Sequence, residues 1–524
     1  MAVDALANIV WISLIAALIA LFVRSRGWGI AFPLLACGLV VGVLPWGPSA
    51  PDDPELLQVL VLAPLVFGEA LSSSYVDLKS VRRPVLALAV GLVAISTLAI
   101  GGLTSVLIAG IPVAMALAVG AILAPTDAVV VAASARRANL PPRLVSILEG
   151  ESLLNDGTGL TALRVATLAA LAGSVGTGQA AALLVQTVAV GVAFGLLGGW
   201  LLVLLLRRSD DTAAHGAVLL MAPIPLYLSA ETAGGSGILA VVLAALMASQ
   251  ATYADPAYEG RLQVTAVWRA ITVLLQAAAF FLLGLELPEA LRHLPAEDRT
   301  TLWWAVPAIV AGLIAVRMVV VWGAFGLGRL FGTDIPNRWR SATLVGWAGS
   351  RGPVSALAAF SLPLATADGL PLPARDMVVA ATLLAVAVTL VLSTTLTPMA
   401  RLLKIQSPDT SAVESRLRLA MARAALSTLD AATADADLRD DPFPAAAIAA
   451  LRTATVHRVG VSKAGSFTRQ DHERLRELQV EMFEAEQLEL HRLRSEEALP
   501  DSAVRPLLTE VDRRIAAVRT TGAA

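Results

Sequence analysis

Apolar residues dominate the first 404 positions and fall into thirteen stretches long enough to form membrane helices. A helix needs about 20 apolar residues to cross roughly 30 Å of hydrocarbon. The stretches centre on residues 5–23, 29–46, 56–73, 84–109, 112–133, 144–173, 178–206, 216–233, 236–250, 267–287, 301–326, 341–362 and 376–401. The pattern therefore predicts an all-α polytopic membrane protein with about 13 transmembrane helices.

Basic residues alternate between the predicted connections, and this alternation predicts an orientation. Cytoplasmic loops of membrane proteins are enriched in Lys and Arg. One side holds Arg24, Arg26, Lys79, Arg82, Arg83, Arg136, Arg137, Arg143, Arg207, Arg208, Arg261, Arg269, Arg329, Arg338 and Arg340. The other side holds Arg292, Arg299, Arg375 and the acidic loop at 52–55. We therefore expect the amino terminus outside and the carboxyl tail in the cytoplasm.

Charged residues concentrate in the last part of the chain, where residues 405–524 contain 35 of the 80 charged side chains. Mixed charges at helical spacing predict exposed helices there. The sequence thus divides into a membrane domain, residues 1–404, and a cytoplasmic helical tail, residues 405–524. The tail's role is left open between stabilising the chain and regulating it.

The remaining composition excludes several classes of protein. Only 15% of residues are charged and mean hydropathy is +0.73, whereas about a quarter of the residues of soluble proteins are charged. The net charge of −2 gives no basic surface for nucleic acid, and the single Cys37 excludes a disulfide framework. The five histidines fall in predicted loops or in the tail, so no catalytic or metal-binding group is indicated and we expect no enzyme.

Three polar residues interrupt the fifth stretch. Pro125 removes a backbone hydrogen bond from the helix, and Thr126 and Asp127 follow it in an otherwise apolar segment. Free carbonyls, a hydroxyl and a carboxylate then converge on one point, which suits a hard monovalent cation. The alternative is a proline kink with an aspartate that caps the next helix.

The sixth stretch contains the run EGESLLNDG at 149–157. At helical spacing Ser152 and Asp156 share one face, and Glu151 and Asn155 share a neighbouring face. We expect Ser152 and Asp156 to face an ion path together with the carboxylate of the fifth stretch, and Glu151 to serve as a structural counter-charge. The alternative is a cytoplasmic loop in which the acids are simply solvated.

The twelfth stretch places Arg351 between glycines and Pro353, which predicts a second broken helix. A guanidinium at that depth requires a carboxylate partner, and Glu151 is the partner that the sequence suggests. Two interrupted helices, at 125–127 and 349–353, lie about seven spans apart. This spacing indicates inverted repeats with a site near the bilayer midplane.

Other polar residues within the spans give weaker signals. Glu69 either lines the central cavity or bonds to a neighbouring helix. Arg317 pairs with an acid or reaches toward the interface, and a structural role is favoured. Arg164 lies two turns beyond the predicted ion-binding aspartate, and Glu231 is its expected partner near the external mouth.

Together these motifs resemble the sodium/proton exchangers of the cation:proton antiporter superfamily, in their bacterial electroneutral branch with an Asn-Asp motif. The resemblance covers residues 5–401 and rests on PTDA at 125–128, EGESLLNDG at 149–157 and GSRGPV at 349–354. Weaker support comes from FGEAL at 67–71, SGILAVV at 236–242 and FFLLGLEL at 280–287. It implies a secondary antiporter, in a homodimer, in a bacterial-type plasma membrane, serving pH homeostasis and sodium tolerance without a cofactor.

The resemblance also implies roles for the residues of the ion site. Asp156 would bind a proton or Na⁺ in turn, with Ser152 and Thr126 as further ligands of the cation. Asp127 would lie in the unwound crossing, and Asn155 would occupy the place of a second aspartate found in electrogenic relatives. Because Asn155 cannot titrate, one Na⁺ or Li⁺ would exchange for one H⁺ without net charge movement.

Supporting residues follow from the same resemblance. Glu151 and Arg351 would form a buried pair, and Glu69 would lie near the ion path. The chain departs from the family's pattern at Ala128, Gly157 and Arg164. A K⁺/H⁺ antiporter of the same architecture, a cation channel and a membrane sensor remain as alternatives.

Overall fold

The computed structural model describes residues 2–26, 28–44, 58–171, 177–208, 211–254, 258–327, 337–366, 369–405, 411–434, 469–497 and 499–520. Within these residues every named element is a helix. This agrees with the predicted all-α class, because a helix satisfies its own backbone hydrogen bonds where no water is present. The acidic loop at 52–55 falls outside the described residues.

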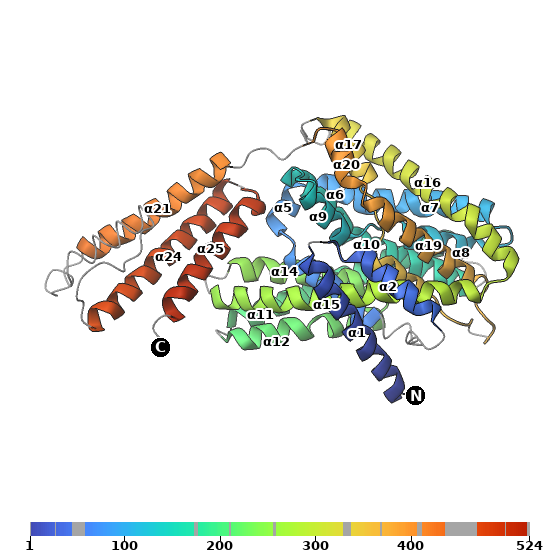
Figure 1. Ribbon diagram of the computed structural model, residues 1–524, viewed down its shortest axis with the longest axis horizontal. Coiled ribbons are helices and arrows are strands. Elements are labelled where there is room, and N and C mark those ends of the chain that lie inside the picture. Colours follow the sequence, from blue (N-terminus) through green and yellow to red (C-terminus); the bar gives the residue numbers. More distant parts are fainter. Residues whose placement is uncertain are drawn as a thin grey trace. The chain divides into compact units, whose positions relative to one another are not determined.

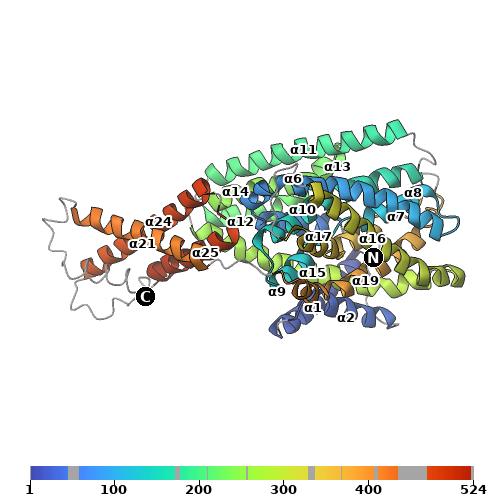
Figure 2. The ribbon, with the colours of Figure 1, turned by 90° about the horizontal axis from the view of Figure 1, so that it is seen from above.

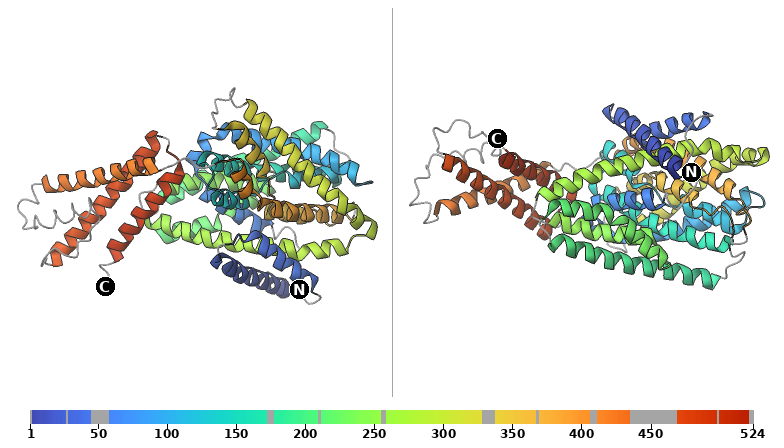
Figure 3. Two further views of the ribbon diagram at one scale, coloured as in Figure 1. Left: turned by 45° about the horizontal axis from the view of Figure 1, so that its top comes forward. Right: turned by 90° about the horizontal axis from the view of Figure 1, so that it is seen from below.

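The first part of the chain forms helices that correspond to the first four predicted stretches. They are α1 (Ala2–Ser25), α2 (Ala31–Val43), η1 (Gln58–Leu62), α4 (Ala63–Ser72), α5 (Tyr75–Ser80), α6 (Arg82–Leu86), η2 (Ala87–Leu92) and α7 (Val93–Leu107). Helices α1 and α2 lie side by side at the blue end of the chain (Figure 3).

The middle of the chain holds α8 (Val113–Leu123), α9 (Ala128–Arg137), α10 (Pro142–Leu171), α11 (Thr177–Arg208), α12 (Thr212–Met221), α13 (Pro223–Thr232) and α14 (Gly237–Ala254). Next come α15 (Tyr258–Arg292), α16 (Ala296–Leu327), α17 (Arg338–Trp347), α18 (Pro353–Phe360), α19 (Arg375–Ser393) and α20 (Leu396–Leu402). Each predicted stretch thus contains one to three of these helices.

Five described helices are long and apolar enough to span a membrane by their own length and composition. They are Arg82–Leu107, Gly178–Arg208, Val264–Arg292, Ala296–Leu327 and Arg375–Ser393. Shorter apolar helices lie in five further predicted stretches, at Trp11–Ser25, Ala31–Val43, Val59–Ser72, Val113–Leu123 and Gly237–Thr252. The total of thirteen spans stays a prediction.

Contacts between helices define two compact units in the chain. The first comprises Met1–Gln250 and Thr265–Ser407, and the second comprises Ala251–Val264 and Pro408–Ala524. In the second unit, the described tail helices α21 (Ser411–Ala434), α24 (Arg469–Glu497) and α25 (Asp501–Thr520) enclose an apolar core that includes Leu490 and Val511. The domain boundary predicted after residue 404 stays a prediction.

Helix α10 occupies the centre of the first unit. It packs against α8 and α9, and α8 packs in turn against α7, which contacts α16 (Figure 1). On its other side α10 contacts the long helix α11, which runs beside α13 (Figure 2). Buried side chains of α10, α16 and α17, including Ile147, Val321 and Leu344, share one apolar cluster. The helix that carries the EGESLLNDG run is therefore surrounded by protein.

Candidate functional site

The first interruption lies where the sequence predicts it. Helix α8 ends at Leu123 and α9 begins at Ala128, with Pro125 between them. Thr126 and Asp127 lie in the gap and are 3% and 7% exposed. The Asp127 Oδ1 atom accepts a hydrogen bond from the Val130 N–H at 2.9 Å, so this aspartate caps α9. The break and the capping aspartate are therefore both present, and cation binding at this point stays a prediction.

The second interruption crosses the first. Helix α17 ends at Trp347 and α18 begins at Pro353. The Asp127 N–H donates to the Ser350 carbonyl oxygen at 2.9 Å. An ideal Cβ placed on Gly352 would lie 1.6 Å from Asp127 Oδ2, so the absence of a side chain lets the two breaks touch. Two segments more than two hundred residues apart therefore form one structure.

Charges at this crossing match the helix ends around them. Asp127 lies at the N-terminus of α9 and against Gly352, the residue before α18, where helix dipoles are positive. Arg351 Nε donates to the Leu123 carbonyl oxygen at 2.7 Å, at the C-terminus of α8, and its guanidinium also donates to the Gly349 carbonyl oxygen. An acid thus offsets the positive helix ends and an arginine offsets the negative ones.

Helix α10 is continuous from Pro142 to Leu171, so its acids do not form a solvated loop. It docks on the first interruption through three contacts. The Ser152 hydroxyl donates to the Thr126 carbonyl oxygen, and Asn155 Nδ2 donates to Thr126 Oγ1 at 3.1 Å. An ideal Cβ on Gly159 would lie 2.3 Å from Pro125 Cγ, so the helix and the break are in close contact.

Three carboxylates gather beside these contacts. Asp156 is 3% exposed, and the charges of Glu69 and Asp127 both act on it. Glu69 lies on α4 and accepts a hydrogen bond from the Gln276 side chain of α15. Several negative charges in a buried region repel one another strongly unless protons or cations neutralise them. The cluster is therefore suited to binding positive charge.

The ion pair of Glu151 differs from the one that the sequence suggests. Its carboxylate pairs with Arg317 of α16, through Nη1 and, at 2.9 Å, through Nη2. Both side chains are buried, with 1% and 2% exposed. Pairing with Arg351 was therefore the wrong expectation. In the folded chain α16 lies beside α17, and Arg317 Nε also donates to the Val345 carbonyl oxygen of α17 at 3.2 Å.

Arg351 needs no carboxylate of its own, because main-chain carbonyls satisfy it. Besides its two carbonyl contacts, its backbone N–H donates to Thr389 Oγ1 of α19 at 3.2 Å. Both arginines thus end on carbonyl groups near helix C-termini, where cations are stabilised. The expected structural role of Arg317 as an ion-pair partner is confirmed.

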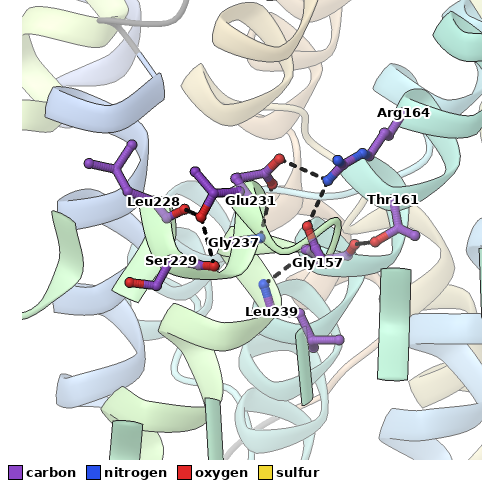
Figure 4. Close-up of polar contacts among 11 residues, drawn as sticks. Gly157, Thr161, Arg164, Leu228, Ser229, Glu231, Gly237 and Leu239 are labelled. Carbon is purple, nitrogen blue, oxygen red and sulfur yellow. Dashed lines mark hydrogen bonds and ion pairs between the residues drawn. The ribbon is translucent and has the colours of Figure 1, made fainter. Parts of the chain in front are cut away.

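The predicted pair of Arg164 and Glu231 is also confirmed. Arg164 Nη1 lies 2.8 Å from Glu231 Oε2 and donates to the Gly235 carbonyl oxygen at 2.6 Å. The other oxygen of Glu231 accepts the Gly237 N–H at 2.9 Å, at the start of α14 (Figure 4). The pair joins α10 to the turn between α13 and α14.

Two polar residues near the site escaped the sequence-based selection. Gln276, 4% exposed, holds Glu69, and Thr389, 2% exposed, holds the second interruption. The available signal was a polar side chain inside a long apolar stretch. Both residues are common in membrane helices as ordinary helix–helix contacts, so position alone did not distinguish them.

Comparison with known proteins identifies the family. The profile of the sodium/hydrogen exchanger transmembrane family matches residues 10–402. The chain belongs to this family. It is therefore a membrane transporter that exchanges cations for protons.

Individual relatives support this assignment. The chain is 32% identical over 447 residues to an uncharacterized Na⁺/H⁺ exchanger of Mycobacterium tuberculosis, covering 82% of this chain and 80% of the relative. It is 32% identical over 387 residues to the sodium, potassium, lithium and rubidium/H⁺ antiporter of Bacillus subtilis, covering 71% of this chain and 58% of the relative. The solved sodium proton antiporter MjNhaP1 of Methanocaldococcus jannaschii shares the fold, with a TM-score of 0.62, 20% identity, and coverage of 76% and 98%.

Proposed function

We propose that this exchanger carries Na⁺, or Li⁺, in one direction and H⁺ in the other, one for one, with both ions competing for Asp156. The supporting observation is the convergence of the helix crossing and α10. Ser152 and Asn155 both bond to Thr126, one residue from Asp127, and the charge of Asp127 acts on Asp156. A cation in this place meets oxygen atoms and an excess of negative charge.

The hydrogen-bond directions suit a small cation. The Ser152 hydroxyl gives its proton to the Thr126 carbonyl oxygen, so its own lone pairs can face a cation. Hard cations prefer carboxylate, hydroxyl and carbonyl oxygen ligands. Asp156, Ser152 and Thr126 supply one oxygen type each, and Asp127 adds a nearby charge.

The expected stoichiometry rests on Asn155. It donates its amide hydrogen to Thr126 and has no ionisable group. Asp156 then gains either a proton or a cation, and the charge of the loaded site is the same in both cases. We expect exchange without net charge movement, driven by either ion gradient.

Transport requires Asp156 to face the two sides of the membrane in turn. In this mechanism the helices around the crossing shift against a dimeric scaffold, and the broken helices keep the ligands together during the shift. The asymmetry of basic residues supports an amino terminus outside and a cytoplasmic tail. Homodimer formation belongs to the same proposal.

K⁺/H⁺ exchange at the same site is the second candidate. The name of the Bacillus subtilis relative includes potassium and rubidium as well as sodium and lithium. Larger cations need longer distances to the same oxygens, so the ion order is an experimental question. Channel and sensor functions are less favoured.

The decisive experiment uses proteoliposomes with an internal pH dye and an imposed proton gradient. Na⁺, Li⁺ and K⁺ are added in turn to wild-type protein and to Asp156→Asn, with and without a potassium–valinomycin voltage clamp. Dissipation by Na⁺ or Li⁺ that is insensitive to the clamp and lost in Asp156→Asn supports the proposal.

Other outcomes separate the alternatives. If K⁺ alone dissipates the proton gradient, the transported cation is K⁺ instead of Na⁺ or Li⁺. Large voltage-driven currents identify a channel. A silent wild type from pH 5 to pH 9, or an unaffected Asp156→Asn, overturns the proposed mechanism.

A further inference from the structure

Helix α10 makes two ion pairs, and they differ in burial. Near its ion-binding segment, Glu151 pairs with Arg317 at 1% and 2% exposure. Farther along, Arg164 pairs with Glu231 at 32% and 33% exposure. Separating a fully buried pair leaves two uncompensated buried charges, whereas a half-buried pair is less desolvated and loses less when its members separate. The second pair is therefore the less costly of the two to open.

The two pairs also connect α10 to different parts of the fold. Residues 151–159 of α10 contact the first interruption and α16. Arg164 contacts the turn at 233–237. That turn is held by α11, because the Ser236 N–H donates to the Thr187 carbonyl oxygen at 3.0 Å. Asp156 lies within the first of these attachments, about two helical turns before Arg164.

We propose that Arg164 and Glu231 form a clasp that holds α10 against the α13–α14 turn in one of the two alternating states, and that this clasp opens once in each exchange cycle. The inference rests on the proposed alternating-access mechanism. If the helices around the crossing move against the rest of the unit, a polar contact from α10 to a turn held by α11 must be released.

The turn is built to survive this release. Glu231 divides its two oxygens, so that Oε1 accepts the Gly237 N–H while Oε2 meets Arg164 (Figure 4). When Arg164 leaves, the first contact still caps α14. At Gly157, next to Asp156, α10 is in van der Waals contact with α14, since an ideal Cβ there would lie 3.5 Å from Leu239 Cδ1. Apolar packing of this kind can slide without losing a hydrogen bond.

Arg164 is therefore a positioning residue, and its removal should shift the balance of the two states. A shift lowers the apparent cation affinity on one face of the membrane and raises it on the other, because each face binds only one state. In vesicles of uniform orientation, we expect Arg164→Ala and Glu231→Gln to change the half-saturating cation concentration about two- to five-fold, in opposite directions at the two faces.

Matched variants separate the clasp from general damage. The double variant should change the half-saturating cation concentrations no more than either single variant does. Arg164→Lys should leave these concentrations closer to the wild-type values than Arg164→Ala does. Glu289→Gln is the control, because Glu289 pairs with Arg292 at 3.1 Å within the single helix α15. Equal changes at both faces, or no change, would overturn the clasp.

Cross-linking tests the opening step directly. In a Cys37→Ser background, Arg164→Cys and Glu231→Cys are joined by a short, reducible bis-thiosulfonate reagent. We expect exchange to stop and to return on reduction, while the same treatment of Glu289→Cys with His293→Cys, one turn apart on α15, leaves it intact. Full exchange by the cross-linked 164–231 protein would refute the clasp. Exchange by the untreated protein shows separately that the proposed function stands.

Discussion

At the scale of residues, the buried pair of Glu151 and Arg317 fixes α10 to α16. Neither charge can be hydrated where it lies, so each depends on the other. Arg351, close by, donates instead to main-chain carbonyl oxygens. Both arginines lie in apolar stretches of the sequence, but Arg317 depends on a carboxylate and Arg351 on main-chain carbonyl groups.

This difference leads to a testable prediction. Glu151→Gln should destabilise the protein by about 3–5 kcal/mol, because it leaves the Arg317 charge buried without its partner. Thermal unfolding in detergent measures the loss. Removing both charges in Glu151→Gln with Arg317→Met should recover part of it.

The control variant replaces Arg351 instead of Arg317. Glu151→Gln combined with Arg351→Met should show much weaker coupling than the combination with Arg317→Met, as measured by a double-mutant cycle. Stronger coupling to Arg351 would contradict the pairing in the structure.

At the scale of elements, the two broken helices depend on close backbone contact. Gly352 faces the Asp127 carboxylate, and the Asp127 N–H bonds to the Ser350 carbonyl oxygen. Each break leaves main-chain groups that a continuous helix would satisfy, and the other break or an arginine supplies their partners. The crossing is thus stable only when both breaks are in register.

We therefore expect Gly352→Ala to impair transport strongly. The added Cβ would overlap Asp127, and relief of such overpacking costs about 1–3 kcal/mol and displaces the carboxylate. Cation-dependent proton flux in proteoliposomes measures the effect. Gly102→Ala is the control, because an ideal Cβ there meets nothing within 4 Å. Equal fluxes for the two variants would show that transport continues when the two breaks are moved apart.

The sequence predicted these elements well for a physical reason. Proline and glycine change local backbone freedom wherever they occur, so the breaks near 125 and 351 could be located without a fold. The continuous run of α10 followed from the helical spacing of its acids. By contrast, Gln276 and Thr389 gain their roles from neighbouring helices, so their positions in the chain carried little information.

At the scale of the whole molecule, the residues of the proposed ion site all lie in the first compact unit. The tail helices have their own apolar core, which includes Leu417, Leu490 and Ile515. The first unit therefore contains every residue of the proposed site, and the tail helices have a separate core. The match to the family profile covers residues 10–402 and also ends before the tail.

We predict that a chain ending at Ser407 keeps cation/proton exchange with an unchanged order of cations. The half-saturating concentration or pH profile can shift if the tail regulates transport. Proteoliposome flux measures activity, and size-exclusion chromatography in detergent confirms that the shortened protein remains folded. Complete loss of exchange by folded, shortened protein would support the sensor alternative instead.

The sequence by itself determined the membrane class, the helical stretches, the two breaks and the polar residues that carry the chemistry, because hydrophobic length, proline, glycine and buried charge act locally along the chain. Tertiary structure decided the partners. Glu151 selects Arg317 because α16 and α10 bring those side chains together, and Arg351 meets the end of α8 because the two breaks cross. Partner choice depends on distances between helices that are far apart in sequence, and these distances exist only in the packed fold.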